Sequence, residues 1–102
     1  MKTTIEYIPT DTLDGFATKH DLRLHIRERA LPVGHPDRYY ASFDNCEVSE
    51  PPFLVGVFGN GATPDEAKRD YAEVISMKRI VINAWGMKRR EIDVPRLIEP
   101  TP

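Results

Sequence analysis

The chain of 102 residues lacks several features that would narrow its function at once. Cys46 is its only cysteine, so an internal disulfide is excluded, which fits a reducing compartment such as the cytoplasm. No apolar run approaches the roughly 20 residues of a membrane span, and the first residues lack the apolar core of a signal peptide. The formal net charge of -2 gives no global attraction to nucleic acid or to anionic membranes. We therefore expect a cytoplasmic protein that does not associate with membranes.

What is present is typical of one small domain. Hydrophobic residues make up 40% and charged residues 29% of the chain, ordinary proportions for a domain with a modest core. We expect residues 1–94 to form a single globular domain. Residues 95–102 are rich in proline and are expected to form a loosely ordered tail.

The N-terminal half predicts a short helix followed by a strand. Asp11 or Thr12 can cap the helix. Its apolar residues recur at helical spacing, namely Leu13, Phe16 and Ala17. The period then changes to two, which predicts a strand with one buried and one solvated face. The apolar side of this strand is Leu22, Leu24 and Ile26, and the basic side is Arg23, His25, Arg27 and Arg29.

Two more strands are expected before the second helix. The first covers residues 38–46 and places alternate residues on one face, namely Tyr39, Ala41 and Phe43. A turn at Glu50-Pro51-Pro52 separates it from residues 53–58, which are apolar enough to form a central strand.

The strongest local signals predict a helix over residues 63–78. Thr63 can cap it, Glu66 can close a capping box, and Pro64 falls at the first helical position. Its apolar stripe is Ala67, Tyr71, Val74 and Ile75. Residues 79–84 and 90–94 then predict a β-hairpin around Trp85.

These elements predict an α+β fold. Their order is α-β-β-β-α, followed by a C-terminal β-hairpin. Because strands joined by short loops pair antiparallel, we expect one antiparallel sheet with both helices on one face.

This order resembles that of a double-stranded-RNA-binding domain. The shared positions are His35 and Tyr39 before the second strand, and Gly59, Gly61, Thr63, Ala67 and Lys68 around the start of the last helix. Pro64 and Asp65, however, stand where that family has two phosphate-binding lysines. Since Asp65 followed by Glu66 repels phosphates, the resemblance implies the fold but only weak binding of nucleic acid through this helix.

A second resemblance, over residues 39–84, is to HicB-type antitoxins. Two segments are similar to that family's Y-x-A-x-F strand and G-x-T-x-E-E-A helix start, namely Tyr39-Tyr40-Ala41-Ser42-Phe43 and Gly61-Ala62-Thr63-Pro64-Asp65-Glu66-Ala67. The C-terminal DNA-binding module usual in that family has no counterpart in residues 95–102. The chain also resembles small phage and prophage proteins. These resemblances imply an inhibitor of a nuclease, either an HicA-like RNase toxin or a host-defence nuclease.

Three sets of residues could carry phosphate, metal or acid–base chemistry. The possible phosphate loop is Gly56, Gly59 and Gly61. The possible metal ligands are His20, His25 and His35 with Cys46 or Asp44. The possible acid–base residues are Asp44, Glu47 and Glu50. The glycines lack the lysine of a phosphate loop and favour a turn, the histidines lack paired metal-ligand spacing, and the carboxylates fall in an exposed loop. Cys46 has no obvious activating base. We therefore expect no enzyme, no metal site and no cofactor.

The candidate partner-binding residues are basic or aromatic. They are Arg23, His25, Arg27 and Arg29 on the first strand, Tyr40 on the second, and Lys88, Arg89 and Arg90 on the hairpin. We expect the first strand's basic side on the uncovered sheet face. It is either a solvated face balanced by cross-strand acids, which is favoured, or a docking surface for an acidic partner. Trp85 is either a stacking platform or, as favoured, a core residue at the hairpin turn.

The leading hypothesis is a small non-enzymatic protein that inhibits a protein partner, by resemblance a nuclease. One alternative is a nucleic-acid-binding module that uses the basic sheet face. Another is a structural phage component. The identity of the partner, the oligomeric state, including a homo-oligomer, and the source organism are left open.

Overall fold

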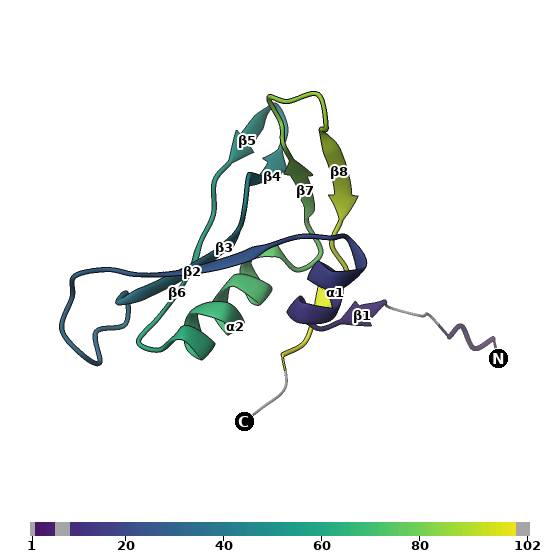
Figure 1. Ribbon diagram of the computed structural model, residues 1–102. Helices are drawn as coiled ribbons and strands as arrows, with labels where there is room; N and C mark the ends of the chain where they lie inside the picture. The colour runs from purple at the N-terminus through teal and green to yellow at the C-terminus, as the bar shows by residue number, and fades with distance from the viewer. Residues whose placement is uncertain (1, 6–8, 100–102) are drawn as a thin grey trace.

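The computed structural model describes residues 2–5 and 9–99 (Figure 1). Within them the chain forms two helices and nine strands. Their order is β1 (Thr10–Asp11), α1 (Leu13–Lys19), β2 (Leu24–Glu28), β3 (Tyr39–Phe43), β4 (Cys46–Glu50), β5 (Phe53–Val55), β6 (Gly59–Gly61), α2 (Pro64–Ile75), β7 (Arg79–Ile82), β8 (Arg90–Asp93) and β9 (Arg96–Leu97).

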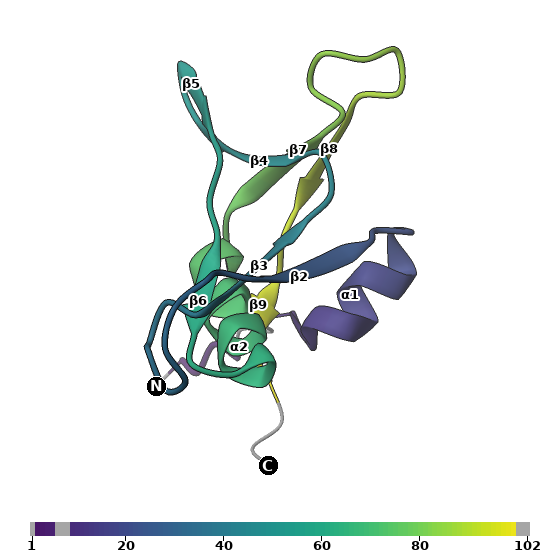
Figure 2. The ribbon, with the colours of Figure 1, turned by 60° about the vertical axis from the view of Figure 1, so that its left-hand side comes forward.

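The predicted α+β class is confirmed, but the strands form more than one sheet. The first sheet has the order β2-β3-β6 and the second the order β5-β4-β7-β8, and both are antiparallel. A short parallel pair joins β1 to β9. Figure 2 shows the second sheet extending away from the first, with the loop between β7 and β8 at its far end.

Helix α2 begins where its sequence predicts. Thr63 is the N-cap, and its Oγ1 accepts a hydrogen bond from the Glu66 N–H at 3.2 Å, while Pro64 occupies the first turn. The Glu66 carboxylate accepts from the Ala62 N–H at 2.9 Å. The capping box therefore closes one residue earlier than usual, and both side chains still satisfy backbone donors.

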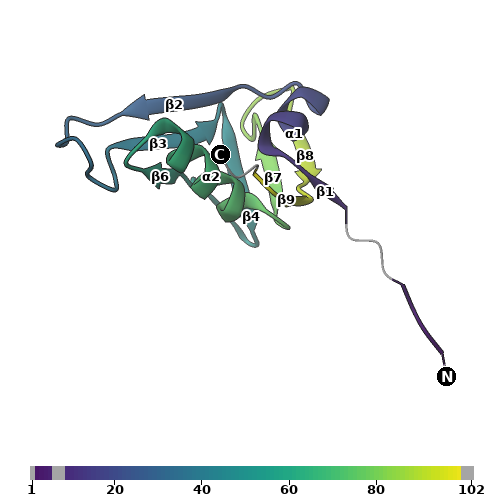
Figure 3. The same cartoon turned by 90° about the horizontal axis from the view of Figure 1, so that it is seen from below.

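The apolar stripe of α2 packs on the first sheet. Ala67, Tyr71 and Ile75 are buried as the stripe predicts, Val74 is partly buried, and Ala72 joins them. Figure 3, from below, shows α2 lying across β3 and β6. The helix ends at residue 75, earlier than predicted, because the chain turns there to enter β7.

Helix α1 also matches its prediction. The Thr12 Oγ1 accepts from the Gly15 N–H at 3.0 Å and caps the helix. Three predicted residues are buried, namely Leu13, Phe16 and Ala17. Both helices lie on the same side of the first sheet (Figure 1), and the ring of Phe16 lies 6.2 Å from that of Phe43.

The second and third predicted strands form one bent hairpin that the two sheets share. β3 pairs with β6 in the first sheet, and β4 pairs with β5 in the second. Between these pairings, residues 42–47 of one arm lie opposite the shorter stretch 56–58 of the other. The unequal lengths interrupt the ladder and bend the hairpin, as a β-bulge does on a smaller scale.

Two expectations about this hairpin are therefore wrong. Residues 38–46 are not one strand, because the chain turns at Asn45, whose φ is 51°. Residues 53–58 are not a central strand, because β5 and β6 are edge strands of different sheets. Phe53 is 69% exposed and Phe58 is 48% exposed. Because the chain bends between β5 and β6, no part of the apolar segment 53–58 lies at the centre of a sheet.

Gly59 and Gly61 lie in β6 rather than in the predicted turn. A Cβ on Gly59 would overlap the backbone of Tyr71 and Ala67, and a Cβ on Gly61 would overlap the backbone of Ala67. The two glycines therefore let β6 lie directly against α2, an approach that a larger residue prevents.

The predicted C-terminal hairpin is present as β7 and β8. The prediction of a loosely ordered tail, in contrast, is wrong for residues 95–99. β9 pairs with β1, Leu97 is buried, and its N–H donates to the Ser76 Oγ at 2.9 Å. Residues 100–102 lie outside the described residues.

Candidate functional site

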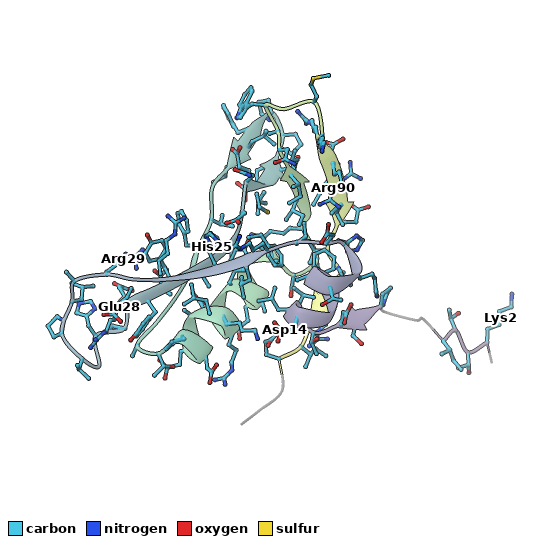
Figure 4. All side chains as sticks on the ribbon, viewed as in Figure 1. Lys2, Asp14, His25, Glu28, Arg29 and Arg90 are labelled. Atoms are coloured by element: carbon cyan, nitrogen blue, oxygen red, sulfur yellow. The ribbon has the colours of Figure 1, made fainter. Side chains whose placement is uncertain are left out.

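The face of the first sheet that points away from α2 carries the basic side of β2. β2 pairs with β3 so that Arg27 lies opposite Tyr40. Figure 4 shows His25 and Arg29 on the side of β2 away from α2, and Glu28 on the side toward it. The alternation in the sequence is thus an alternation of faces. We call the side with His25, Arg27, Arg29 and Tyr40 the open face.

Most of the candidate cations have no acidic partner. The Nδ1 of His25 lies 3.0 Å from the Oδ1 of Asp44, and the Nη2 of Arg89 lies 3.4 Å from the Oε1 of Glu91. The rest form no ion pair with any residue that the structure describes, namely Arg23, Arg27, Arg29, Lys88 and Arg90. On the basic side of β2, only His25 lies within ion-pair distance of a described acid, so direct ion pairs support the favoured explanation, in which cross-strand acids balance the face, only there. Opposite Arg27 the next strand offers a phenol rather than a carboxylate.

Arg29 and Phe58 hold Tyr40 in place. The guanidinium carbon of Arg29 lies 4.2 Å from the centroid of the Tyr40 ring, and the Phe58 ring packs edge-on at 5.5 Å. The Nη1 of Arg29 donates to the Asp37 carbonyl at 2.7 Å and to the Asn60 Oδ1 at 2.8 Å. These acceptors are neutral, so Arg29 is fixed in position without losing its net charge.

A cleft of about 730 Å³ lies between the open face and the second sheet. It brings together four of the candidate residues from β2, β3 and the loop between β7 and β8, namely His25, Arg27, Tyr40 and Lys88. Its walls also include Asp44, Glu47, Phe58, Trp85 and Met87. Residues far apart in the sequence thus meet at the inside of the hairpin bend.

The remaining candidates lie outside this cleft. The Nη1 of Arg90 donates to the His20 carbonyl at 2.7 Å and ties β8 to the end of α1. Arg89 borders a separate hollow of about 460 Å³ with Phe53 at the far end of the second sheet. The predicted basic residues therefore fall into two groups, those that line the cleft and those that lie outside it.

Backbone hydrogen bonds fix the bend that forms the floor of the cleft. The Asp44 N–H donates to the Arg23 carbonyl at 2.9 Å, which ties the bend to the chain just before β2. The Asn83 N–H donates to the Asn45 carbonyl at 2.9 Å, which ties it to the end of β7. Both sheets therefore anchor the bend, and the cleft is held open by the backbone.

Tyr71 of α2 supports the same bend from below. Its hydroxyl accepts from the Phe43 N–H at 3.1 Å and donates to the Cys46 Sγ at 3.8 Å. Burial raises the pKa of the Cys46 thiol to about 11, against the opposing effect of the Tyr71 hydrogen bond. Burial also raises the pKa of Tyr71 above its ordinary value. Because nucleophilic attack requires the thiolate, the raised pKa disfavours a nucleophilic role for this thiol.

Trp85 is not the core residue that its position in the hairpin predicted. It is 89% exposed on the loop between β7 and β8, and Met87 beside it is fully exposed. The loop extends beyond the second sheet, so nothing in the described part of the chain packs over it. In the sequence, Trp85 and Met87 flank a glycine and directly precede three basic residues. This pattern could have indicated an exposed interaction site.

The three histidines occupy separate environments. The His20 ring lies 4.6 Å from that of Phe16, and the His35 Nδ1 accepts from the Asp37 N–H at 3.1 Å, whereas His25 lines the cleft. Within residues 2–5 and 9–99, no group of three or more histidine, cysteine or acidic residues could hold a metal ion. In that same part of the chain, no helix has both the length and the apolar character to cross a membrane.

The positions shared with double-stranded-RNA-binding domains are engaged within the fold. Lys68 forms an ion pair with Asp14 and connects the two helices. The Glu66 carboxylate caps the start of α2, and Asp65 is exposed beside it. The start of α2 is therefore acidic, and its one lysine faces α1.

No family model, curated protein or solved structure matches this chain. The resemblances to HicB-type antitoxins and to double-stranded-RNA-binding domains thus rest on the motifs quoted above.

Proposed function

We propose that this protein is a small non-enzymatic binding protein that captures an acidic surface of a protein partner through its open face. The observation that carries the proposal is that Arg27, Arg29 and Lys88 form no ion pair with any described acid. Cations that are not engaged in ion pairs can steer an acidic partner and raise the rate of association. Tyr40, held between Arg29 and Phe58, adds a rigid aromatic contact of the kind enriched at interfaces.

The motif resemblance to HicB-type antitoxins suggests a nuclease as the partner and inhibition as the outcome of capture. Nucleases that hold metal ions with carboxylates present acidic groups that would complement the open face. A cytoplasmic location is part of this proposal, since the lone thiol fits a reducing compartment.

A second candidate function is the binding of single-stranded nucleic acid. It is supported by the exposed Trp85 beside Lys88, since base stacking and phosphate contacts require an aromatic surface and cations. Arg29 already covers one face of the Tyr40 ring at 4.2 Å, so Trp85 is the most exposed aromatic ring for base stacking in the cleft, and this candidate is the weaker one.

Affinity capture from a lysate of the native host, with the bound proteins identified by mass spectrometry, tests the proposal. Arg27→Glu should lower recovery of the partner severalfold, and the loss should shrink at high salt because screening weakens exposed charges. Lys78→Glu is the matched control, since Lys78 is an exposed cation on the turn between α2 and β7. Equal recovery by Arg27→Glu and the wild type would contradict the proposal. Loss of the partner after nuclease treatment of the lysate would favour nucleic-acid binding instead.

A further inference from the structure

The cleft between the two sheets is lined by both apolar and charged side chains. We propose that it binds an extended peptide segment of the partner in which a large apolar side chain stands next to a carboxylate, an inference that rests on the proposed function. Its volume of about 730 Å³ lies within the range of roughly 300–1,000 Å³ that is usual for ligand sites. A single side chain would leave most of this volume empty, whereas a short segment of chain can occupy it.

The large apolar residues of the lining include Phe58, Trp85 and Met87. Trp85 is 89% exposed, Met87 is fully exposed, and Phe58 is 48% exposed, yet all three border the same cleft. Large apolar side chains that gather around a concave surface mark an interaction site. Tryptophan and aromatic neighbours are also the residues that most often dominate binding energy at protein interfaces.

The cations of the lining would bind the carboxylate of the proposed segment. Arg27 and Lys88 border the cleft and form no ion pair with any described residue. Arginine binds a carboxylate through two parallel hydrogen bonds, so Arg27 suits an aspartate or glutamate of the partner. Asp44 is paired with His25, while Glu47 is left as an acceptor for the backbone N–H groups of an extended segment.

Two hydrogen bonds within the loop between β7 and β8 hold the backbone around Trp85 and Met87. The Gly86 N–H donates to the Asn83 carbonyl at 2.9 Å, and the Asn83 side-chain amide donates to the Lys88 carbonyl at 3.4 Å. These bonds restrict the backbone around Trp85 and Met87 before any peptide binds. Less conformational entropy is therefore lost when the peptide binds.

The same residues fit a nucleotide less well. Arg29 covers one face of the Tyr40 ring at 4.2 Å and the Phe58 ring packs perpendicular to it at 5.5 Å, so part of the Tyr40 ring is already in contact within the fold. Trp85 is the more exposed platform for a base, and a single platform gives little of the stacking that several bases would supply.

A titration followed by NMR of the full, ¹⁵N-labelled chain tests the proposal. Trp85 is the only tryptophan, so its indole N–H gives a single, assignable signal. The probe is a short blocked peptide with phenylalanine between two aspartates. The comparison probes are the same peptide with lysines in place of the aspartates, and cytidine 5′-monophosphate. We expect the acidic peptide alone to shift the Trp85 indole and the backbone amides of His25 and Asn45 in a saturable way.

Variants test the apolar and the charged contributions separately. Met87→Ala and Arg27→Gln should each weaken binding of the acidic peptide by about fivefold or more, as truncation of an interface anchor does. Met77→Ala is the control, because Met77 is 67% exposed but does not border the cleft, and it should leave the affinity unchanged. Equal shifts from the basic peptide, shifts from the nucleotide alone, or indifference to Met87→Ala would overturn the proposal.

The two proposals fail in different ways. Partner capture that depends on Arg27, together with the absence of any peptide-induced shift, would reject the peptide cleft and retain the proposed function. Saturable peptide binding, together with capture that is indifferent to Arg27→Glu, would reject the proposed function and retain the cleft as a peptide site.

Discussion

The two sheets share the strands of one hairpin but are stabilised in different ways. In the first sheet, Gly59 and Gly61 bring the backbone of β6 against α2, and the opposite face stays open. In the second sheet, branched side chains such as Val48 and Ile80 provide the buried contacts. The first sheet therefore depends on close backbone approach on one face and leaves the other face available for binding. Substitutions on its two faces should differ sharply in their effect on stability.

Gly59→Ala should have the largest effect. The new Cβ would overlap the backbone of Tyr71 and Ala67, which can move only if α2 separates from β6. We expect the free energy of unfolding, measured by urea denaturation, to fall by about 3 kcal/mol or more, at the upper end for overpacked sites. Gly56→Ala is the control, because nothing lies within 4 Å of its added Cβ. Similar losses for both variants would mean that the helix–strand contact is not the main constraint.

Tyr71→Ala should be nearly as damaging, at roughly 3 kcal/mol, because it removes a buried aromatic from the stripe of α2. Tyr71→Phe tests the hydroxyl alone. It leaves the buried Phe43 N–H without its acceptor, which should reduce the unfolding free energy by about 1–3 kcal/mol. A Tyr71→Phe variant with wild-type stability in the same denaturation experiment would show that the hydroxyl does not support the bend between the sheets.

Thr63→Ala should reduce the unfolding free energy by about 1 kcal/mol, the usual effect of a lost N-cap. The Thr63 Oγ1 is the acceptor for the Glu66 N–H, and alanine cannot replace it. Thr18→Ala, at an exposed position inside α1, is the control and should not destabilise the protein. If the two variants unfold at the same urea concentration, the cap makes no measurable contribution.

Raising the pH from 9 to 11 should lower stability through Cys46. The pKa of the thiol is raised from 9.0 to about 11 in the folded protein. Between these values the unfolded chain loses the proton while the folded chain keeps it, so stability is lost as the pH rises and is unaffected at lower pH. Urea midpoints across this range should fall less for Cys46→Ala than for the wild type. Parallel decreases in the two proteins would indicate that other groups cause the effect.

Arg27→Glu should have the smallest effect on stability. Arg27 is exposed, and its Nη2 lies 3.4 Å from the Nδ1 of the His25 ring. Exposed charges contribute little to folding, so the melting temperature measured by circular dichroism should stay close to that of the wild type. A large decrease would show that the open face supports the fold and would remove the contrast between the two faces.

Local signals predicted the parts of the fold that depend on near neighbours. The signals for α2 all lie within one short segment, namely the cap at Thr63, Pro64 in the first turn and the apolar stripe that includes Tyr71. The observed helix agrees with them. The alternation along β2, combined with antiparallel pairing, was enough to place Arg27 near Tyr40. This part of the candidate site was accessible because a strand's period fixes its two faces.

The rest depended on contacts between distant segments. The bend arises because residues 42–47 lie opposite residues 56–58, and neither segment reveals that mismatch alone. The exposure of Trp85 depends on how far its loop extends beyond the second sheet. Phe58 and Met87 were missed because composition marks an apolar residue as core, whereas burial is decided by what the fold brings over it.

The pairing of β1 with β9 joins segments from near the two ends of the chain. The Leu13 N–H at the start of α1 donates to the carboxylate of Glu99 at 2.6 Å, across a sequence separation of 86 residues. A contact of such long separation closes a large loop, and the entropic cost of closing large loops slows folding. This end-to-end contact can therefore form only after both segments have been synthesised.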